Sequence, residues 1–254
     1  MRYRARVEYD GTDFAGFQAQ PGLRTIQGVL EGALARLSDG RRVRVAAAGR
    51  TDAGVHALGQ VIAFDYGGRL GPADLMRALD ALLPRDVAVR DLRPAGRAFQ
   101  PRRAARREYR YSIWNGARSP LRERTALGIR QRLDEAAMAA AAAALVGRHD
   151  FQAFGGPVGR HGVRTVHWIR VRRIGSAVTI DIAADAFLRQ MVRAIAAALI
   201  RVGRGAARAE DVAAALRKPD RAFEGDVAAA KGLSLRRVVY GPRRRDDRGN
   251  DGER

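Results

Sequence analysis

Residues 49–66 read Gly-Arg-Thr-Asp-Ala-Gly-Val-His-Ala-Leu-Gly-Gln-Val-Ile-Ala-Phe-Asp-Tyr. Two glycines enclose a polar segment that contains one carboxylate, Asp52, and an apolar alternating run follows at once. Together with a strand predicted just before it, this pattern is typical of a strand, a tight loop and a second strand. We therefore expect Asp52 to lie at the rim of a β-sheet, with Arg50 close enough to control its charge.

Helix and strand signals surround this segment in a regular order. The expected elements of the first half are a strand at 2–10, a helix at 26–37 that Thr25 caps, a strand at 42–48, the Asp52 loop, a strand at 60–66, a helix at 72–83 and a strand at 86–93. The strand at 2–10 alternates apolar and charged side chains, and the helices follow helical apolar spacing. The first half is thus predicted as β-α-β-β-α-β.

The second half repeats that order. Its expected elements are a strand around Tyr109, Tyr111 and Ile113, a helix at 134–145, strands at 164–174 and 177–184, a long helix at 187–202, a short helix from Glu210 and a strand at 233–240. Two such copies predict an α+β fold of two ferredoxin-like β-α-β-β-α-β halves with antiparallel sheets. We expect the halves to span 1–100 and 101–240, a flexible loop at 155–162 and a disordered charged tail at 241–254.

The charge of the chain points to a polyanionic partner. Of 254 residues, 47 are Lys or Arg and 27 are Asp or Glu, which gives a formal net charge of +20. Nucleic acid is the commonest partner for such an excess. Only Lys218 and Lys231 are lysines. We attribute the preference for arginine mostly to GC-biased coding, which does not explain the net excess itself.

Several classes of protein and site are excluded by composition. The absence of cysteine excludes disulfides, thiolate catalysis and zinc–sulfur sites. The N-terminus has no apolar signal-peptide segment, and the longest apolar run, 136–146, is too short to span a bilayer. We expect a cytoplasmic protein with no membrane partner. The histidines show no metal-ligand spacing, so structural roles are expected for His56, His149, His161 and His167.

Asp52 has two interpretations from the residues alone. An aspartate beside glycine is ordinary turn chemistry. Alternatively, its carboxylate acts as a nucleophile or base and must stay ionised inside a partly dry pocket. A cation within about 4–6 Å lowers the pKa of a carboxyl group by roughly 1–3 units, which offsets the effect of burial. The nearby Arg50 favours this second interpretation.

Several motifs resemble the tRNA pseudouridine synthase A family. Segment 49–57, followed by Gly59-Gln60-Val61, resembles the family's active-site motif. The other matching segments are 9–18 (Tyr-Asp-Gly-Thr-Asp-Phe-Ala-Gly-Phe-Gln), 25–31 (Thr-Ile-Gln-Gly-Val-Leu-Glu), 108–111 (Glu-Tyr-Arg-Tyr), 187–193 (Phe-Leu-Arg-Gln-Met-Val-Arg) and 202–205 (Val-Gly-Arg-Gly). They cover almost the whole chain in the family's order, so the functional interpretation of Asp52 is strongly favoured.

The resemblance implies isomerisation of uridine to pseudouridine in the anticodon stem-loop of tRNA, at positions 38–40. The N1–C1′ bond breaks, the uracil rotates, and a bond forms through C5, without cofactor, metal or redox partner. Whether the carboxylate adds to the sugar, adds to the base or removes a sugar proton is left open. The resemblance also implies a homodimer that holds tRNA across both subunits, with the two half-sheets merged around a central RNA-binding cleft.

The resemblance also assigns the site residues. The family's catalytic aspartate falls on Asp52, its active-site tyrosine on Tyr109, and the arginine that pairs with the aspartate on Arg193. Tyr109 offers a plane for the target uracil or a hydroxyl for proton transfer, whereas Tyr111 is expected to face the core. Arg50 is expected to help extrude the nucleotide.

A basic cluster lies at the join of the two halves. It consists of Arg102, Arg103, Arg106 and Arg107. A charge run is usually a solvated face, but beside Tyr109 we expect these arginines to contact RNA phosphates. A non-catalytic basic RNA-binding module is the alternative to an enzyme. A DNA-binding protein is a weaker alternative, because the chain has no helix-turn-helix or finger pattern.

Several positions depart from the family's usual residues. Gln100-Pro101, Asp185 and Ala194 stand where the family usually has others. They concern loop shape and tRNA contacts more than the chemistry, because Asp52, Tyr109 and Arg193 are all present.

Overall fold

The first half of the chain forms four strands and two helices in the computed structural model, which describes residues 1–156, 162–217 and 226–241. In chain order they are β1 (Arg2–Tyr9), α1 (Ile26–Arg36), β2 (Ala46–Ala47), β3 (His56–Asp65), α2 (Pro72–Leu82) and β4 (Val87–Pro94). Thr25 caps α1, since its hydroxyl accepts a hydrogen bond from the Gly28 amide at 3.2 Å. The predicted order β-α-β-β-α-β is present here.

The strand predicted at 42–48 is wrong in length, because β2 has only two residues. The side chain of Glu31, from α1, accepts a hydrogen bond from the Val45 amide at 3.0 Å, and Gln27 donates to the Val45 carbonyl at 3.3 Å. Helix side chains therefore satisfy backbone groups that a neighbouring strand would otherwise bind.

The second half contains the remaining elements of the described chain. They are η1 (Pro101–Arg103), β5 (Arg106–Asn115), η2 (Pro120–Arg122), β6 (Leu127–Ile129), α3 (Glu135–Ala143), β7 (Gly147–Asp150), η3 (Gln152–Phe154), β8 (Val163–Ile174), β9 (Ala177–Ala184), α4 (Met191–Gly203), α5 (Ala209–Arg217), η4 (Ala230–Gly232) and β10 (Leu233–Val239), where η marks a short 3₁₀ turn. The short strands β6 and β7 were not predicted. Helix α4 begins at Met191 rather than Phe187, because Gln190 has a left-handed backbone (φ 63°).

All ten strands join one sheet in the order β4-β1-β3-β10-β5-β9-β8-β7, with β2 on β3 and β6 on β5. The β10–β3 and β5–β6 pairs are parallel and the others are antiparallel. The fold is therefore α+β with a mostly antiparallel sheet. The two halves meet where β10 pairs with β3.

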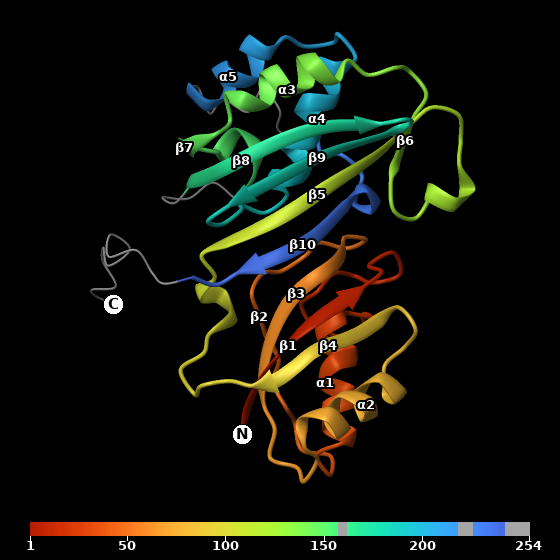
Figure 1. The fold of residues 1–254 in the computed structure, drawn as a ribbon, viewed down its shortest axis with the longest axis vertical. Helices are drawn as coiled ribbons and strands as arrows, with labels where there is room; N and C mark the ends of the chain where they lie inside the picture. The colour runs from red at the N-terminus through yellow and green to blue at the C-terminus, as the bar shows by residue number, and fades with distance from the viewer. Residues whose placement is uncertain (157–161, 218–225, 242–254) are drawn as a thin grey trace.

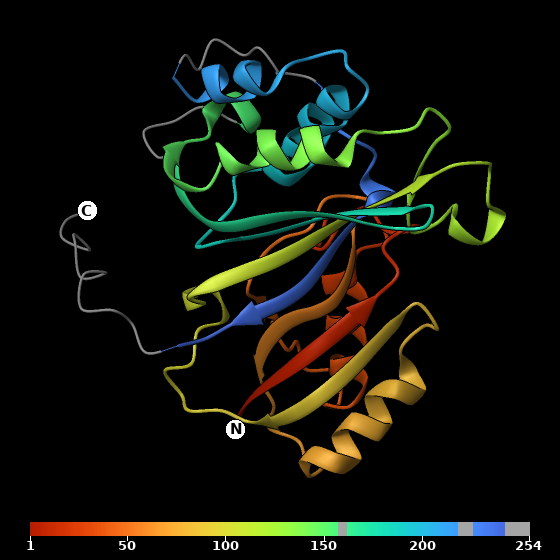
Figure 2. The same cartoon turned by 45° about the horizontal axis from the view of Figure 1, so that its top comes forward.

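One row of cross-strand neighbours links the halves on a single face of the sheet. Tyr9 pairs with Ala57, Ala57 with Leu235, Leu235 with Tyr109, and Tyr109 with Ile182. All five are buried in one apolar core. Since directly paired residues point to the same side, this is the face that the helices cover. Figures 1 and 2 show α1 and α2 behind the first half of the sheet and α3, α4 and α5 grouped at the second half.

Some expectations concern residues outside those described. All but Gly241 of the predicted tail at 241–254 lies outside the described residues, as does most of the predicted loop at 155–162, including His161. His167 lies in β8, as expected. Across the described ranges, no helix combines the length and the apolar character that a membrane crossing requires.

Candidate active site

The Asp52 loop is held by the segment that follows β1. The Phe17 amide donates to the Thr51 carbonyl at 3.0 Å, and the Gly54 amide donates to the Phe14 carbonyl at 3.3 Å. The hydroxyls of Tyr9 and Thr51 are hydrogen-bonded at 2.8 Å. These contacts on both sides of Asp52 fix the loop at the end of β3, so its carboxylate is presented on a rigid support.

Gly16 is a supporting residue that was not identified from the sequence. Its backbone has φ +100°, and a Cβ placed there would lie 2.9 Å from the Thr51 carbonyl oxygen and 3.2 Å from the Ala53 amide. Only glycine permits this close approach of the two loops. The signal was present in the segment 9–18, which contains two glycines among polar and aromatic residues.

Arg193 pairs with Asp52, as predicted. Its Nη1 lies 3.4 Å from Asp52 Oδ2, and its Nε donates to the Ala228 carbonyl at 2.8 Å. The Arg193 side chain is 14% exposed and that of Asp52 is 32% exposed. Helix α4 therefore delivers a nearly buried cation to a carboxylate that remains open to a ligand.

Arg50 lies in the Asp52 loop but is not the ion-pair partner of Asp52. Its side chain is exposed, and among the residues that the structure describes no carboxylate pairs with it. The cation beside Asp52 is Arg193 instead. Arg50 is two residues away in sequence, but it points to solvent, where it is available to a ligand.

Tyr109, on β5, lies beside the loop that carries Asp52. Its ring is buried and packs edge-on against Phe187, with ring centroids 5.2 Å apart. A Cβ on Gly49 would lie 3.8 Å from its hydroxyl. Burial raises the pKa of Tyr109 well above the ordinary value, and the neighbouring Tyr9 and Asp52 raise it further, while Arg107 lowers it. At neutral pH this hydroxyl therefore keeps its proton and can donate a hydrogen bond.

Two further buried tyrosines, Tyr9 and Tyr111, belong to the same core as Tyr109. Burial raises the pKa of Tyr9 to about 12, although its hydrogen bond to Thr51 acts in the opposite direction. Tyr111 is fully buried and donates to the Ala229 carbonyl at 2.9 Å, in agreement with its predicted core position.

The four arginines at the join have different surroundings. Arg102 and Arg103 are exposed, and Arg106 pairs with Glu108 at 2.8 Å. The guanidinium of Arg107 donates to four backbone carbonyls, those of Ala48, Arg102, Ala104 and Asp185. Burial lowers the pKa of Arg107. Arg107 thus ties β5 to three neighbouring segments, and its geometry is that of a structural residue.

The departures from the family's usual residues lie around these groups. Pro101 opens η1, and its carbonyl accepts a hydrogen bond from the Tyr240 hydroxyl at 2.8 Å. Asp185 Oδ1 accepts from the amides of Thr165 and Ala186, at 3.0 and 2.6 Å. Ala194 is buried in α4. Each departure is accommodated without displacing the Asp52–Arg193 pair.

His56 connects the Asp52 loop to η4. Its Nδ1 accepts a hydrogen bond from the Gly11 amide at 3.1 Å, and its Nε2 lies 3.2 Å from the carbonyl oxygen of Lys231, to which it donates. The ring is 6% exposed. This agrees with the structural role that was expected for it.

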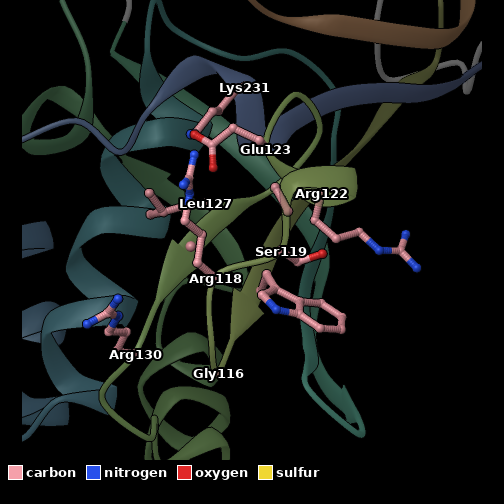
Figure 3. Close-up of a pocket in the computed structure, with 11 residues that line it drawn as sticks. Gly116, Arg118, Ser119, Arg122, Glu123, Leu127, Arg130 and Lys231 are labelled. Carbon is pink, nitrogen blue, oxygen red and sulfur yellow. The ribbon is translucent and has the colours of Figure 1, made fainter.

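A basic pocket of about 250 Å³ lies beyond η4, between Lys231 and the segment that joins β5 to β6 (Figure 3). Its charged lining residues are Arg118, Arg122, Arg130, Lys231 and one carboxylate, Glu123. Lys231 forms an ion pair with Glu123. The Arg122 guanidinium lies 5.6 Å from the centre of the Trp114 ring. The pocket therefore offers an aromatic plane and an excess of cations near η4.

Comparison with known proteins gives consistent matches. A family model described as tRNA pseudouridine synthase matches residues 5–102 and 141–241. A tRNA pseudouridine synthase A from Geotalea uraniireducens is 42% identical over 238 residues, which cover 92% of this chain and 97% of that protein. Proteins of the same name from Myxococcus xanthus and Geobacillus kaustophilus are 44% and 40% identical over 244 residues, which are 94% of this chain and 92% and 95% of theirs.

Proposed function

Because this chain belongs to the tRNA pseudouridine synthase family, we propose that it isomerises uridine to pseudouridine in the anticodon stem-loop of tRNA. The observation that carries this proposal is the convergence of Asp52, Tyr109 and Arg193. These residues come from three separate parts of the chain and gather at one end of β3. A mere RNA-binding surface needs no carboxylate facing a polyanion.

In the proposed reaction, the Asp52 carboxylate acts on the extruded target nucleoside. The N1–C1′ bond breaks, the uracil rotates, and C5 bonds to C1′. The C5 proton leaves and N1 takes up a proton, so that the product is an isomer of the substrate. Arg193 positions the carboxylate through its 3.4 Å contact. The Tyr109 hydroxyl, which burial keeps protonated, donates a hydrogen bond or a proton at the base.

We assign RNA contacts to the exposed cations around this site. Arg50 lies at the loop itself and helps to hold the nucleotide out of its stack, which costs a few kcal/mol. Arg102, Arg103 and Arg106 offer phosphate contacts at the join. Arg107 is not assigned such a contact, because its donors are taken by carbonyls. The basic pocket next to η4 is suited to nucleotides that flank the target.

We further propose that the chain consists of two ferredoxin-like halves, 1–100 and 101–240, merged around a central RNA-binding cleft. The strand orders support this division. The first half has the order β4-β1-β3-β2, and the second has β10-β5-β9-β8, so each half repeats the spatial order fourth, first, third, second. In each half the helices connect strands that are not neighbours.

The family also suggests a cytoplasmic homodimer that holds tRNA across both subunits. Light scattering of the purified protein, with and without tRNA, tests the dimer. A monomer in both conditions would contradict it without affecting the assignment of Asp52.

The function itself is tested by release of tritium from C5-labelled uridine in unmodified tRNA, followed by mapping of the modified position. The wild-type protein should release tritium. Asp52→Asn should abolish release, while tRNA binding in a filter assay stays within a few-fold of wild type. Continued turnover by that variant would overturn the assignment of Asp52, and the absence of release by the wild type would overturn the function.

A further inference from the structure

The face of the sheet opposite the active site is open and rich in arginine. Glu108 and Arg110 flank Tyr109 on β5, so their side chains point away from the helix-covered face. Arg110 pairs across the sheet with Asp181, and Asp181 with Arg170. Figure 1 looks onto this face, and no helix lies in front of β10, β5 or β9 in that view.

A groove of about 370 Å³ crosses the open face over β10, β5, β9 and β8. We name it the arginine groove and define it by Arg110, Arg170, Arg172, Arg236, Arg237 and Trp168. Tyr109 and two carboxylates, Glu108 and Asp181, also line it.

Both carboxylates already have partners. Arg110 donates two hydrogen bonds to Asp181, at 2.7 and 3.0 Å. Glu108 forms an ion pair with Arg106. Within residues 1–156, 162–217 and 226–241, no carboxylate pairs with Arg172, Arg236 or Arg237. The groove therefore keeps an excess of positive charge that the protein itself does not neutralise.

These cations are held close together rather than spread into solvent. The pKa of Arg236 is lowered by burial and by the charge of Arg110, while Asp181 acts in the opposite direction. The Arg170 guanidinium lies 4.9 Å from the centre of the Trp168 ring, a cation–π contact that limits its freedom. Clustered like charges repel one another, and a bound anion relieves that repulsion.

We propose that the arginine groove binds the phosphodiester backbone of RNA, at a part of tRNA remote from the target uridine. This inference rests on the proposed function. Guanidinium groups bind phosphate oxygens bidentately, and arginines without carboxylate partners are free to do so. A second copy of this chain is the less suitable occupant, because two such faces would bring like charges together.

The test compares two charge-matched double variants. Arg172→Gln with Arg236→Gln removes two cations from the groove. Arg69→Gln with Arg77→Gln removes two exposed cations from the α2 region and serves as the control for net charge. For each protein, the dissociation constant of full-length tRNA is measured over a range of salt concentrations, and tritium release is measured on an isolated anticodon stem-loop. The oligomeric state is measured by light scattering.

The groove variant should bind full-length tRNA at least ten-fold more weakly at low salt, and its salt slope should fall by about two, because each removed arginine neutralises one phosphate in the wild-type complex. Its turnover of the stem-loop should equal that of the control. The inference would be overturned if the two double variants bound full-length tRNA equally. It would also be overturned if the groove variant lost as much turnover on the stem-loop as it lost in tRNA binding, or if it changed from dimer to monomer. If the wild-type protein bound tRNA but released no tritium, the proposed function would be contradicted. The comparison of tRNA binding by the two double variants would still test the groove.

Discussion

Arg193 Nη1 and Asp52 Oδ2 lie 3.4 Å apart, although 141 residues separate them in the chain. Asp52 lies in a loop of the first half, and Arg193 lies in the first turn of α4 in the second half. The pair is possible because β10, which follows α4, returns to β3 and joins the two halves into one sheet. The centre of the site is thus a contact between the halves.

Replacing Arg193 should damage turnover more than binding. Arg193→Met removes the cation, and we expect tritium release to fall on the order of 100-fold, the scale of losing one charged group that acts at a reacting centre. Arg193→Lys keeps the charge but cannot bind Asp52 and the Ala228 carbonyl at the same time through a planar fork, so its loss of turnover should be smaller. Single-turnover rates and filter binding separate the two effects. Equal rates for wild type and Arg193→Met would contradict a positioning role.

Gly16 should matter through the shape of the Asp52 loop. Gly16→Ala places a Cβ 2.9 Å from the Thr51 carbonyl oxygen, so we expect at least a ten-fold loss of turnover. The control is Gly22→Ala, which also has a positive φ (+71°) but has nothing within 4 Å of the new Cβ. Both variants should lose about 1–2 kcal/mol of stability from backbone strain. If both retain full activity, the close approach of the two loops is not needed for catalysis.

The hydroxyl of Tyr109 should contribute separately from its ring. Tyr109→Phe keeps the packing against Phe187 but removes the protonated donor. We expect tRNA binding to be unchanged and turnover to fall on the order of 100-fold, the lower range for a general acid. The rate should be measured in single turnover. A Phe variant with wild-type turnover would leave only the aromatic plane as the role of Tyr109.

Arg107 should behave as a structural residue. Arg107→Gln leaves four backbone carbonyls without their donor, and we expect a loss of about 2–3 kcal/mol in the free energy of unfolding. The exposed Arg103 provides the contrast: Arg103→Gln should leave stability unchanged and lower the salt slope of tRNA binding by about one. Urea denaturation and salt-dependent binding give the two readouts. If Arg107→Gln instead left stability unchanged and lowered the salt slope of tRNA binding, Arg107 would be an RNA contact.

Alkaline pH should destabilise the fold through its buried tyrosines. Burial raises the pKa of Tyr9 from 10.0 to about 12. The folded protein therefore keeps a proton that the unfolded chain loses above about pH 10. This stabilisation is fully present below about pH 10 and is lost as the pH rises through about 12. Denaturation followed by circular dichroism should show a shallower decline for Tyr9→Phe than for wild type. Parallel declines would show that Tyr9 does not contribute.

The alternation of residues 2–10 and the helical spacing after Thr25 and Pro72 correctly predicted β1, α1 and α2. Such patterns work because they record which side of each element is buried. The same local pattern did not reveal that the side chains of Gln27 and Glu31 bind the backbone at Val45, which shortened β2. Nor did it reveal the left-handed Gln190 that delays the start of α4.

Asp52, Tyr109 and Arg193 were predicted as site residues from the sequence because each lies within a run of characteristic neighbours. The resemblance also named Arg193 as the partner of Asp52, but only the tertiary structure shows how the two side chains meet. Arg50 is near in sequence but points to solvent, whereas Arg193 is brought in by helix α4. Likewise, composition predicted a polyanionic partner, but only strand pairing gathers the arginines of the open face into one groove. Side-chain type and local periodicity are properties of the sequence itself, while partners far apart in the chain depend on how the strands pair in space.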